Sequence, residues 1–203
     1  MQQIITRKGT KVEDPPLAKT LFADPRLSVL WLILRVWLGY QWVSAALHKV
    51  SSPAWVDGGT ALKGFWTGAV AVPADGRPAI AFDWYREFIQ LMLDAEAYVW
   101  FGKLVAYGEL LVGIALILGA FTGVAALFSG FMNWNFMMAG SASTNPMLFT
   151  IAVGLILAWK IAGYIGLDYF LLPMLGTPWG GEKGKEAESV PGSLEGSPVA
   201  AGD

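Results

Sequence analysis

The 203-residue sequence contains no cysteine and only one histidine, His48. The lack of cysteine excludes disulfides, iron–sulfur clusters held by thiolates, and any persulfide chemistry on a cysteine of this chain. Haem and zinc sites usually draw on several His or Cys ligands, so a single histidine argues against both. We therefore expect neither a metal nor a haem cofactor.

Charge is also scarce, since only 15% of the residues are Asp, Glu, Lys or Arg. Soluble domains average about 25%. Hydrophobic residues make up 55% of the chain and its mean hydropathy is +0.49. The formal net charge of −2 gives no indication of nucleic-acid binding. The composition indicates one membrane domain, with the lipid bilayer as its main partner.

Four long apolar stretches dominate the chain, and each approaches the roughly 20 residues that cross a hydrocarbon core of about 30 Å. We expect an all-α integral membrane protein, built as a bundle of four transmembrane helices with a long first loop that contains short interfacial helices. The expected helices cover residues of about 27–49, 103–120, 123–140 and 146–168.

The remaining segments give the expected domain organisation. Residues 1–25 form an N-terminal tail, 26–175 the membrane domain, and 176–203 a disordered tail rich in Gly, Glu, Ser and Pro. Arg35 interrupts the first apolar stretch, which favours a retained helix over a cleaved signal peptide. Lys and Arg number seven in the two tails and five in the first loop, so we expect both termini in the cytoplasm, with the protein in the plasma membrane.

The connection formed by residues 51–102 is unusually long, and loops of this length are usually functional. Within residues 79–100, apolar side chains recur at helical spacing: Phe82, Tyr85, Ile89 and Met92. Charged residues lie between them. This pattern predicts an amphipathic helix that either lies at the membrane interface or packs on the bundle.

Three charged residues lie well inside the apolar stretches: Arg35, Glu109 and Lys160. The third stretch carries Asn133 and Asn135 instead. An ionisable group at such depth costs a few kcal/mol and by default indicates a site or a pairing. We therefore treat these five residues as the candidate site, with Glu109, Arg35 and Lys160 as its catalytic members.

Two interpretations of this set remain open. In one, the residues line a cavity in which Arg35, Lys160 and the two asparagines donate hydrogen bonds to a quinone while Glu109 moves a proton. In the other, Glu109 forms an interhelical ion pair with Arg35 or Lys160. The second interpretation leaves one cation over, which favours an anion or a polarised carbonyl as ligand.

The first apolar stretch has a second polar face. Gln41, Ser44 and His48 follow one another at helical spacing and point away from the face of Arg35 and Lys49. His48 and Lys49 could attract an anion at the mouth of the cavity, or they could be interfacial anchors. Gln41, His48 and Lys49 join Asn133 and Asn135 as candidate substrate- or quinone-binding residues.

Three segments in order resemble a known family. The first is RVWLGYQW at 35–42 followed by His48 and Lys49, and the second is Trp55 with GGTAL at 58–62. The third is GELLVGIALILG at 108–119 followed by Phe121, Thr122 and Gly123. Together they resemble the DoxX/DoxD family of membrane proteins over residues 26–172.

The resemblance implies a four-helix subunit similar to the DoxD subunit of thiosulfate:quinone oxidoreductase. Such an enzyme oxidises thiosulfate to tetrathionate and passes the electrons to membrane quinone, which here is an acceptor and not a resident cofactor. A DoxA-like or other oxidoreductase subunit would be a separate partner, and a homo-oligomer is compatible with the resemblance. The alternative is a non-catalytic membrane anchor of a respiratory or redox-defence complex. A transporter ranks last, because inverted repeats and broken helices are not evident.

Overall fold

A computed structural model describes residues 4–5, 11–12 and 14–176 of the chain. The regular secondary structure of the described part is helical except for one antiparallel pair of two-residue strands, β1 (Ile4–Ile5) and β2 (Lys11–Val12). The disordered tail expected at 176–203 lies outside the described residues, apart from residue 176.

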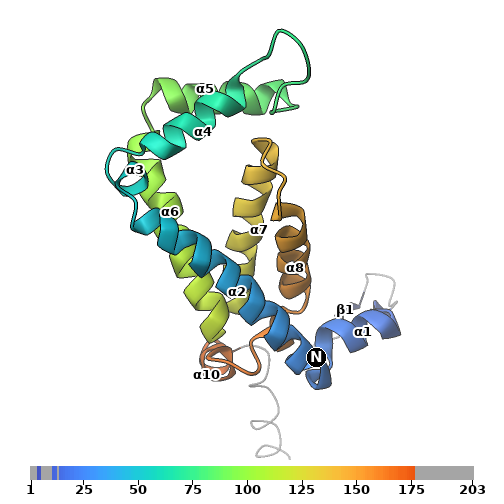
Figure 1. Cartoon of the computed structure of the whole chain (residues 1–203). Coiled ribbons are helices and arrows are strands. Elements are labelled where there is room, and N and C mark those ends of the chain that lie inside the picture. The colour runs from blue at the N-terminus through green and yellow to red at the C-terminus, as the bar shows by residue number, and fades with distance from the viewer. Residues whose placement is uncertain (1–3, 6–10, 13, 177–203) are drawn as a thin grey trace, which may run out of the picture.

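Eleven helical segments follow the strands in the described part (Figure 1). They are α1 (Pro16–Ala23), η1 (Pro25–Leu27), α2 (Ser28–Val50), α3 (Pro53–Val56), α4 (Thr60–Val70), α5 (Asp83–Asp94), α6 (Tyr98–Leu118), α7 (Thr122–Met138), α8 (Asn145–Leu157), α9 (Trp159–Ala162) and α10 (Asp168–Met174).

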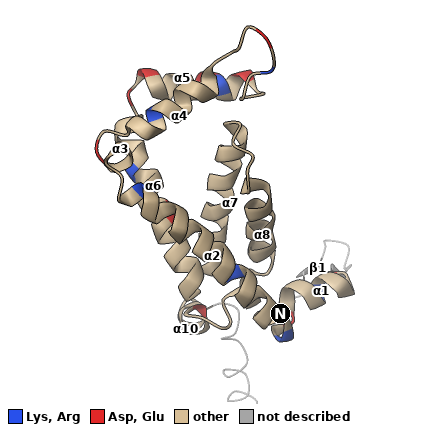
Figure 2. Cartoon of the chain, in the orientation of Figure 1, with Lys and Arg blue, Asp and Glu red and all other residues tan. Residues whose placement is uncertain are grey.

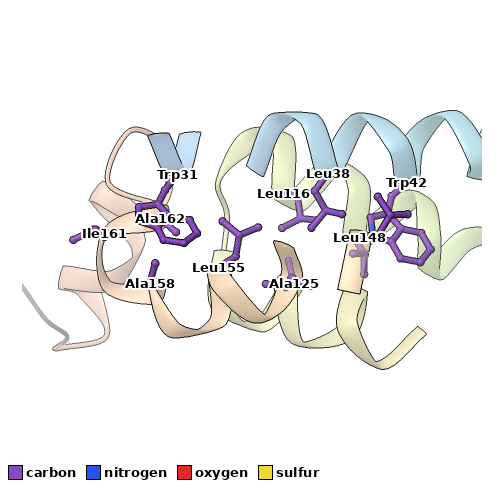
Figure 3. Close-up of a cluster of buried hydrophobic side chains, with 13 residues drawn as sticks. Trp31, Leu38, Trp42, Leu116, Ala125, Leu148, Leu155, Ala158, Ile161 and Ala162 are labelled. Atoms are coloured by element: carbon purple, nitrogen blue, oxygen red, sulfur yellow. The ribbon is translucent and has the colours of Figure 1, made fainter. Parts of the chain in front are cut away.

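The main body consists of two helix pairs, α2 with α6 and α7 with α8, in which the helices of each pair run antiparallel (Figure 1). Their facing sides form the larger hydrophobic core, which is shown in Figure 3. Its fully buried side chains include Leu38, Leu116, Ala126, Ala152 and Leu155. The prediction of an all-α fold is therefore confirmed.

Helix boundaries differ from the expected ones in two places. The second long helix begins at Tyr98 and not near 103, because α5 ends at Asp94 and only a short turn separates the two. The expected fourth helix over 146–168 is wrong in its last part. The helix breaks at Ala158, and α9 ends at Ala162.

The reason for this early ending lies in the chain that follows α9. The backbone N–H of Leu167 donates to the carbonyl of Leu118, and that of Asp168 donates to the carbonyl of Gly119. These bonds hold the segment against the end of α6, so it does not continue the helix. A Cβ at Gly163 would lie 2.1 Å from Asp168 Oδ2, so this turn requires glycine.

Two helical stretches are long and apolar enough to cross a membrane, Pro25–Val50 and Tyr98–Leu118. Only 33% and 28% of their apolar windows are buried inside the protein. Core helices of soluble proteins are mostly buried, so these values favour membrane association over a soluble core. Helix α8 is apolar but shorter, at 13 residues.

Residues 53–97 form a separate arm above the bundle, which contains α3, α4 and α5 (Figure 1). The arm has its own small core, in which Leu62, Trp66 and Ile89 pack with Tyr98 of α6 and Ala139 after α7. The sequence prediction of short helices in the long first loop agrees with this arrangement.

Close contact between α2 and α6 depends on two glycines. A Cβ at Gly113 would lie 2.8 Å from the backbone nitrogen of Val43, and one at Gly39 would lie 2.8 Å from the carbonyl oxygen of Gly113. Because the atoms in the way belong to the backbone, they cannot rotate aside. The two helices therefore approach closely only while both positions lack a side chain.

We expect Gly113→Ala to destabilise the protein by about 1–3 kcal/mol, the usual cost of overpacking. Gly108→Ala in the same helix is the matched control, since nothing lies within 4 Å of its added Cβ. The control should be neutral or stabilising by up to about 1 kcal/mol, as alanine favours helix. Unfolding of the purified variants measures both. Equal stabilities would contradict the close crossing.

Candidate functional site

Seven polar or charged residues are buried in the described part: Ser28, Arg35, Glu109, Thr122, Ser129, Asn133 and Asp168. Figure 2 shows how few charges the bundle carries, and α7 and α8 contain none. Glu109 and Arg35 are the centres of two clusters of these groups. Both clusters include residues of α2 and α7.

The centre of the first cluster is an ion pair between Lys49 of α2 and Glu109 of α6. Lys49 Nζ lies 2.7 Å from Glu109 Oε1 and 2.5 Å from Oε2. The Glu109 side chain is completely buried, and that of Lys49 is 18% exposed. Because Lys49 donates to both oxygens, the charge of this carboxylate is balanced inside the protein.

Helix direction explains this pairing. Side chains on a helix lean toward its N-terminus. Lys49, near the end of α2, therefore reaches back into the bundle, whereas Glu109 on antiparallel α6 leans toward it. Glu109 lies about 16 Å along α6 from Tyr98, near the middle of that helix. If the helix began at residue 103, as the sequence predicted, Glu109 would lie only about 9 Å from its start. Glu109 therefore lies deeper in the bundle than expected.

Aromatic rings surround the ammonium group of Lys49. Its Nζ lies 5.2 Å from the ring centroid of Trp55 in α3 and 5.7 Å from that of Phe136 in α7. Both distances fall in the range of cation–π attraction. Lys49 thus joins α2, α6, α7 and the arm, and it forms the exposed side of the ion pair.

Asn133 is the unsatisfied member of this cluster. Its side chain is fully buried, and neither its amide nitrogen nor its oxygen has a hydrogen-bond partner among residues 4–5, 11–12 and 14–176. On α7 it lies between Ser129, which accepts a 2.7 Å bond from Trp42 Nε1, and Phe136, which faces Lys49. Asn133 therefore offers a free donor and a free acceptor in the part of the bundle that holds the ion pair.

The second cluster lies at the opposite end of the bundle, around Arg35. This guanidinium is 1% exposed and donates from Nη2 to the carbonyl of Ile165 at 2.8 Å. Its Nε and Nη1 have no hydrogen-bond partner within the described part of the chain. Asp168 supplies the nearby negative charge, and its carboxylate accepts bonds from the backbone nitrogens of Phe121 and Thr122 at 2.5 and 2.8 Å.

Asp168 therefore has two roles in this cluster. It caps the N-terminus of α7, where negative charge is favourable, and it balances Arg35. Glycine permits the close packing here, because a Cβ at Gly119 would lie 1.5 Å from Arg35 Nη1. The cluster fastens α2 to the turn between α6 and α7 and to the segment after α9.

The expected pairing of Glu109 with Arg35 or Lys160 is wrong. Glu109 pairs with Lys49, and Arg35 leans toward the N-terminus of α2, away from that carboxylate. Lys160 is half-buried in α9 and lies 6.0 Å from the ring of its neighbour Trp159. Asp168 lies near Arg35, whereas Lys160 forms no ion pair among the described residues.

The other candidate residues lie at the edge of these clusters. His48 is exposed and Gln41 is half-buried, on the face of α2 that does not carry Arg35 and Lys49. Asn135 is half-buried and accepts a 3.0 Å bond from Tyr85 of the arm. Burial raises the pKa of the Tyr85 phenol above its ordinary value, so the phenol remains a neutral donor.

Two surface pockets stand out in the described part. One, of about 550 Å³, lies on the outward face of α2 beside Trp37 and Tyr40. The other, of about 290 Å³, lies beside Thr122, Trp159 and Asp168. Neither is lined by the ion pair or Asn133. Asn133 is fully buried, so a ligand can contact it only if neighbouring side chains move.

Sequence reasoning missed Asp168 and Ser129 as buried polar groups. A signal for Asp168 was present, because the turn before Thr122 offers backbone donors that need a buried acceptor. However, Asp168 and these donors lie more than forty residues apart in the chain, so no local sequence pattern marks their pairing. The described part holds no group of three His, Asp or Glu residues that could bind a metal ion.

We expect Lys49→Met to destabilise the protein by about 3–5 kcal/mol, because it leaves a buried carboxylate without a counter-charge. Adding Glu109→Met should recover most of this loss, since apolar replacement of a whole buried pair is often neutral or stabilising. Lys103→Met on the exposed face of α6 is the matched control. Denaturant unfolding compares the variants, and a Lys49 variant as stable as the control would contradict the pair.

No family model, curated protein or solved structure matches this chain. The resemblance to the DoxX/DoxD family over residues 26–172 therefore stays a prediction from the sequence motifs. What the structure adds is a helical fold with a buried ion pair and an unsatisfied amide between its helices.

Proposed function

We propose that the chain is an integral membrane protein in which four helical segments cross the bilayer: α2, α6, α7 and the pair α8–α9. The arrangement of polar and apolar side chains supports this proposal. Large apolar residues lie exposed along the outward faces of the helices, whereas the polar ones are inside. The outward residues include Ile33, Val36, Leu104, Leu111, Ile114, Leu118, Val124, Leu127, Phe131 and Leu157.

The shorter helices are also compatible with a bilayer. Helix α7 has 17 residues and is about 26 Å long, and α8 with α9 extends about 27 Å. A hydrocarbon core of about 30 Å accommodates such spans by slight thinning or by flanking side chains that reach the interface. Four crossings would put both termini on one side, which we take to be the cytoplasm.

Single-cysteine variants test this topology cleanly, because the chain has no cysteine of its own. We expect a membrane-impermeant maleimide to label Asp75→Cys and Ala142→Cys on intact cells, since both follow an odd number of spans. Asp14→Cys and Leu175→Cys should react only after lysis. All four positions are exposed. Labelling of Asp75 and Ala142 from opposite sides would contradict the four-span arrangement.

We further propose that this bundle is the membrane subunit of a quinone-linked oxidoreductase. The observation that carries this proposal is the free amide of Asn133 in the same region as the Lys49–Glu109 pair. A quinone carbonyl accepts a hydrogen bond that the Asn133 amide can donate. The ammonium of Lys49 stabilises added negative charge, and the ion pair can supply a proton as the quinone is reduced.

The electron donor follows from the family resemblance alone, which implies thiosulfate. Two thiosulfate ions would join through a new S–S bond to give tetrathionate, releasing two electrons. One quinone would take up these electrons with two protons to form the quinol. Thiosulfate would approach from the side of the arm, near His48 and Lys49. The reaction would take place on this chain alone or together with a DoxA-like partner subunit.

A second candidate function, a non-catalytic anchor, is favoured by a specific observation. Each buried charge already has an opposite charge nearby, Glu109 with Lys49 and Arg35 with Asp168. Such pairs can hold helices together without binding a ligand. An anchor would recruit or stabilise a peripheral oxidoreductase, and Asn133 would then be only an unsatisfied core residue.

Thiosulfate-dependent reduction of a short-chain quinone in nanodiscs separates the two functions. We expect Glu109→Gln to lower the rate by about 100-fold or more, as expected for loss of a positioned proton donor. Asn133→Leu should lower it by about 10-fold while leaving stability unchanged or higher, because it removes an unsatisfied amide. Glu87→Gln on the exposed face of α5 is the control and should keep full activity.

Each variant is also tested for folding by its melting temperature, so that loss of activity is not confused with loss of structure. Wild-type protein that reduces no quinone, alone or with a co-expressed partner, would contradict the redox proposal and support the anchor. Full activity in a folded Asn133→Leu variant would remove Asn133 from the site.

A further inference from the structure

Helix α5 of the arm exposes a strip of large apolar side chains that no other part of the described structure covers. Trp84, Phe88 and Leu91 are 57%, 47% and 65% exposed. They follow one another at spacings of four and three residues, so they lie along one side of the helix. Phe82, just before the helix, extends the strip and lies 6.5 Å from Trp84 between ring centroids.

The strip lies between two other faces of α5. On one side of it are Tyr85 and Ile89, which are buried in the core of the arm. On the other side lie the charged residues of the helix, Asp83, Glu87 and Asp94, all exposed. The helix thus changes in order from protein-facing to apolar-exposed to charged, as expected of a helix at a boundary between lipid and water.

Aromatic contacts connect the strip to the outward face of α7. The ring of Tyr85 lies 5.5 Å from Trp84 and 6.2 Å from Trp134 of α7. Trp134 in turn stacks on Phe131 at 6.5 Å, and Phe131 is among the exposed apolar residues of α7. Aromatic contacts thus link the strip on α5 to the outward face of α7 through the buried ring of Tyr85.

The arm is held in this position by contacts with the end of α7 and the turn after it. Tyr85 donates hydrogen bonds to both the carbonyl and the side-chain oxygen of Asn135 at the end of α7. A Cβ at Gly140 would lie 2.8 Å from that of Ala79, so the loop before α5 lies close against the turn after α7. The strip consequently keeps a fixed height relative to the bundle, across whose end α5 lies (Figure 1).

We propose that α5 lies in the headgroup region of the outer leaflet, with Trp84, Phe88 and Leu91 in contact with lipid acyl chains. Asp83, Glu87 and Asp94 face water on the adjacent side of the helix, next to the strip. This proposal rests on the membrane proposal made above for the four helices. It assigns the strip to lipid and excludes a docking site for a protein.

The aromatic link to the bundle favours lipid over a protein partner. Phe131 would face the bilayer if α7 crosses it, and two aromatic contacts link the strip to Trp134, one between Trp134 and Tyr85 and one between Tyr85 and Trp84. Tryptophan is enriched at this depth because its ring is amphipathic. The charged side of α5 carries three carboxylates and one cation, Arg86, which pairs with Asp83. Such a helix gains nothing from anionic lipid, so zwitterionic phosphatidylcholine should suffice.

Fluorescence quenching at single cysteines tests the position of α5. The probe is a bimane attached to Phe88→Cys, Glu87→Cys or, as a control within a proposed span, Leu111→Cys of α6. Leu111 is 69% exposed on the outward face of that helix. The full chain is placed in phosphatidylcholine vesicles, with or without bromine on the acyl chains, and titrated with aqueous iodide.

We expect brominated lipid to lower the bimane emission at residues 88 and 111 by at least two-fold, whereas iodide quenches the label at residue 87. Leu91→Cys repeats the test on the strip should the Phe88 variant fold poorly. Quenching at 111 but iodide access at 88 would overturn the interfacial position of α5 while leaving the four spans intact.

Protection at 88 from both quenchers would mean that a second copy or another protein covers the strip, and this result would also overturn the proposal. Iodide access at 111 would overturn the membrane proposal itself, and the position of α5 with it.

Discussion

A carboxylate enclosed by apolar helices constrains the rest of this structure. Glu109 is completely buried near the middle of α6, and a charge there is tolerable only with a partner close by. Lys49 supplies it from the end of α2, because its long side chain leans back into the bundle. The pair therefore sets the register of α2 against α6, which the close contact of Gly39 with Gly113 also requires. Trp55 and Phe136 around Lys49 extend the same constraint to the arm and to α7.

The cluster around Arg35 stabilises the opposite end of the bundle in the same way, because it places a buried cation near an anion. Arg35 brings a cation, and Asp168 brings an anion that also caps α7. The two clusters lie apart along α2, because residues 35 and 49 are separated by about 21 Å of helix. Between them the core is apolar, so neither cluster can exchange partners with the other. The Lys49–Glu109 ion pair and the charges of Arg35 and Asp168 thus each connect a different part of the bundle.

The sequence predicted the helical fold, the first three long helices and the buried positions of Arg35, Glu109 and Asn133, because each depends on local hydropathy. It did not predict the partners. Pairing Glu109 with Arg35 or Lys160 rested on the rule that charges buried in a membrane pair with one another. The lean of each side chain toward the N-terminus of its helix decides which charges meet. Asp168 was missed because its role depends on backbone donors far away in the chain. The early end of the fourth helix likewise follows from tertiary hydrogen bonds at Leu167 and Asp168, which no periodicity encodes.

Asn133 distinguishes a structural bundle from one that binds a ligand. A protein that needs only to hold its helices together gains nothing from a buried amide without partners, which costs about 1–3 kcal/mol. Its neighbours show that this region can satisfy polar groups, since Ser129 receives the indole of Trp42 and Glu109 receives Lys49. Under the quinone proposal, this unsatisfied group would receive its partner from outside the chain. A carbonyl compound from the bilayer would supply the missing acceptor, and the ion pair would lie close to the charge that its reduction creates.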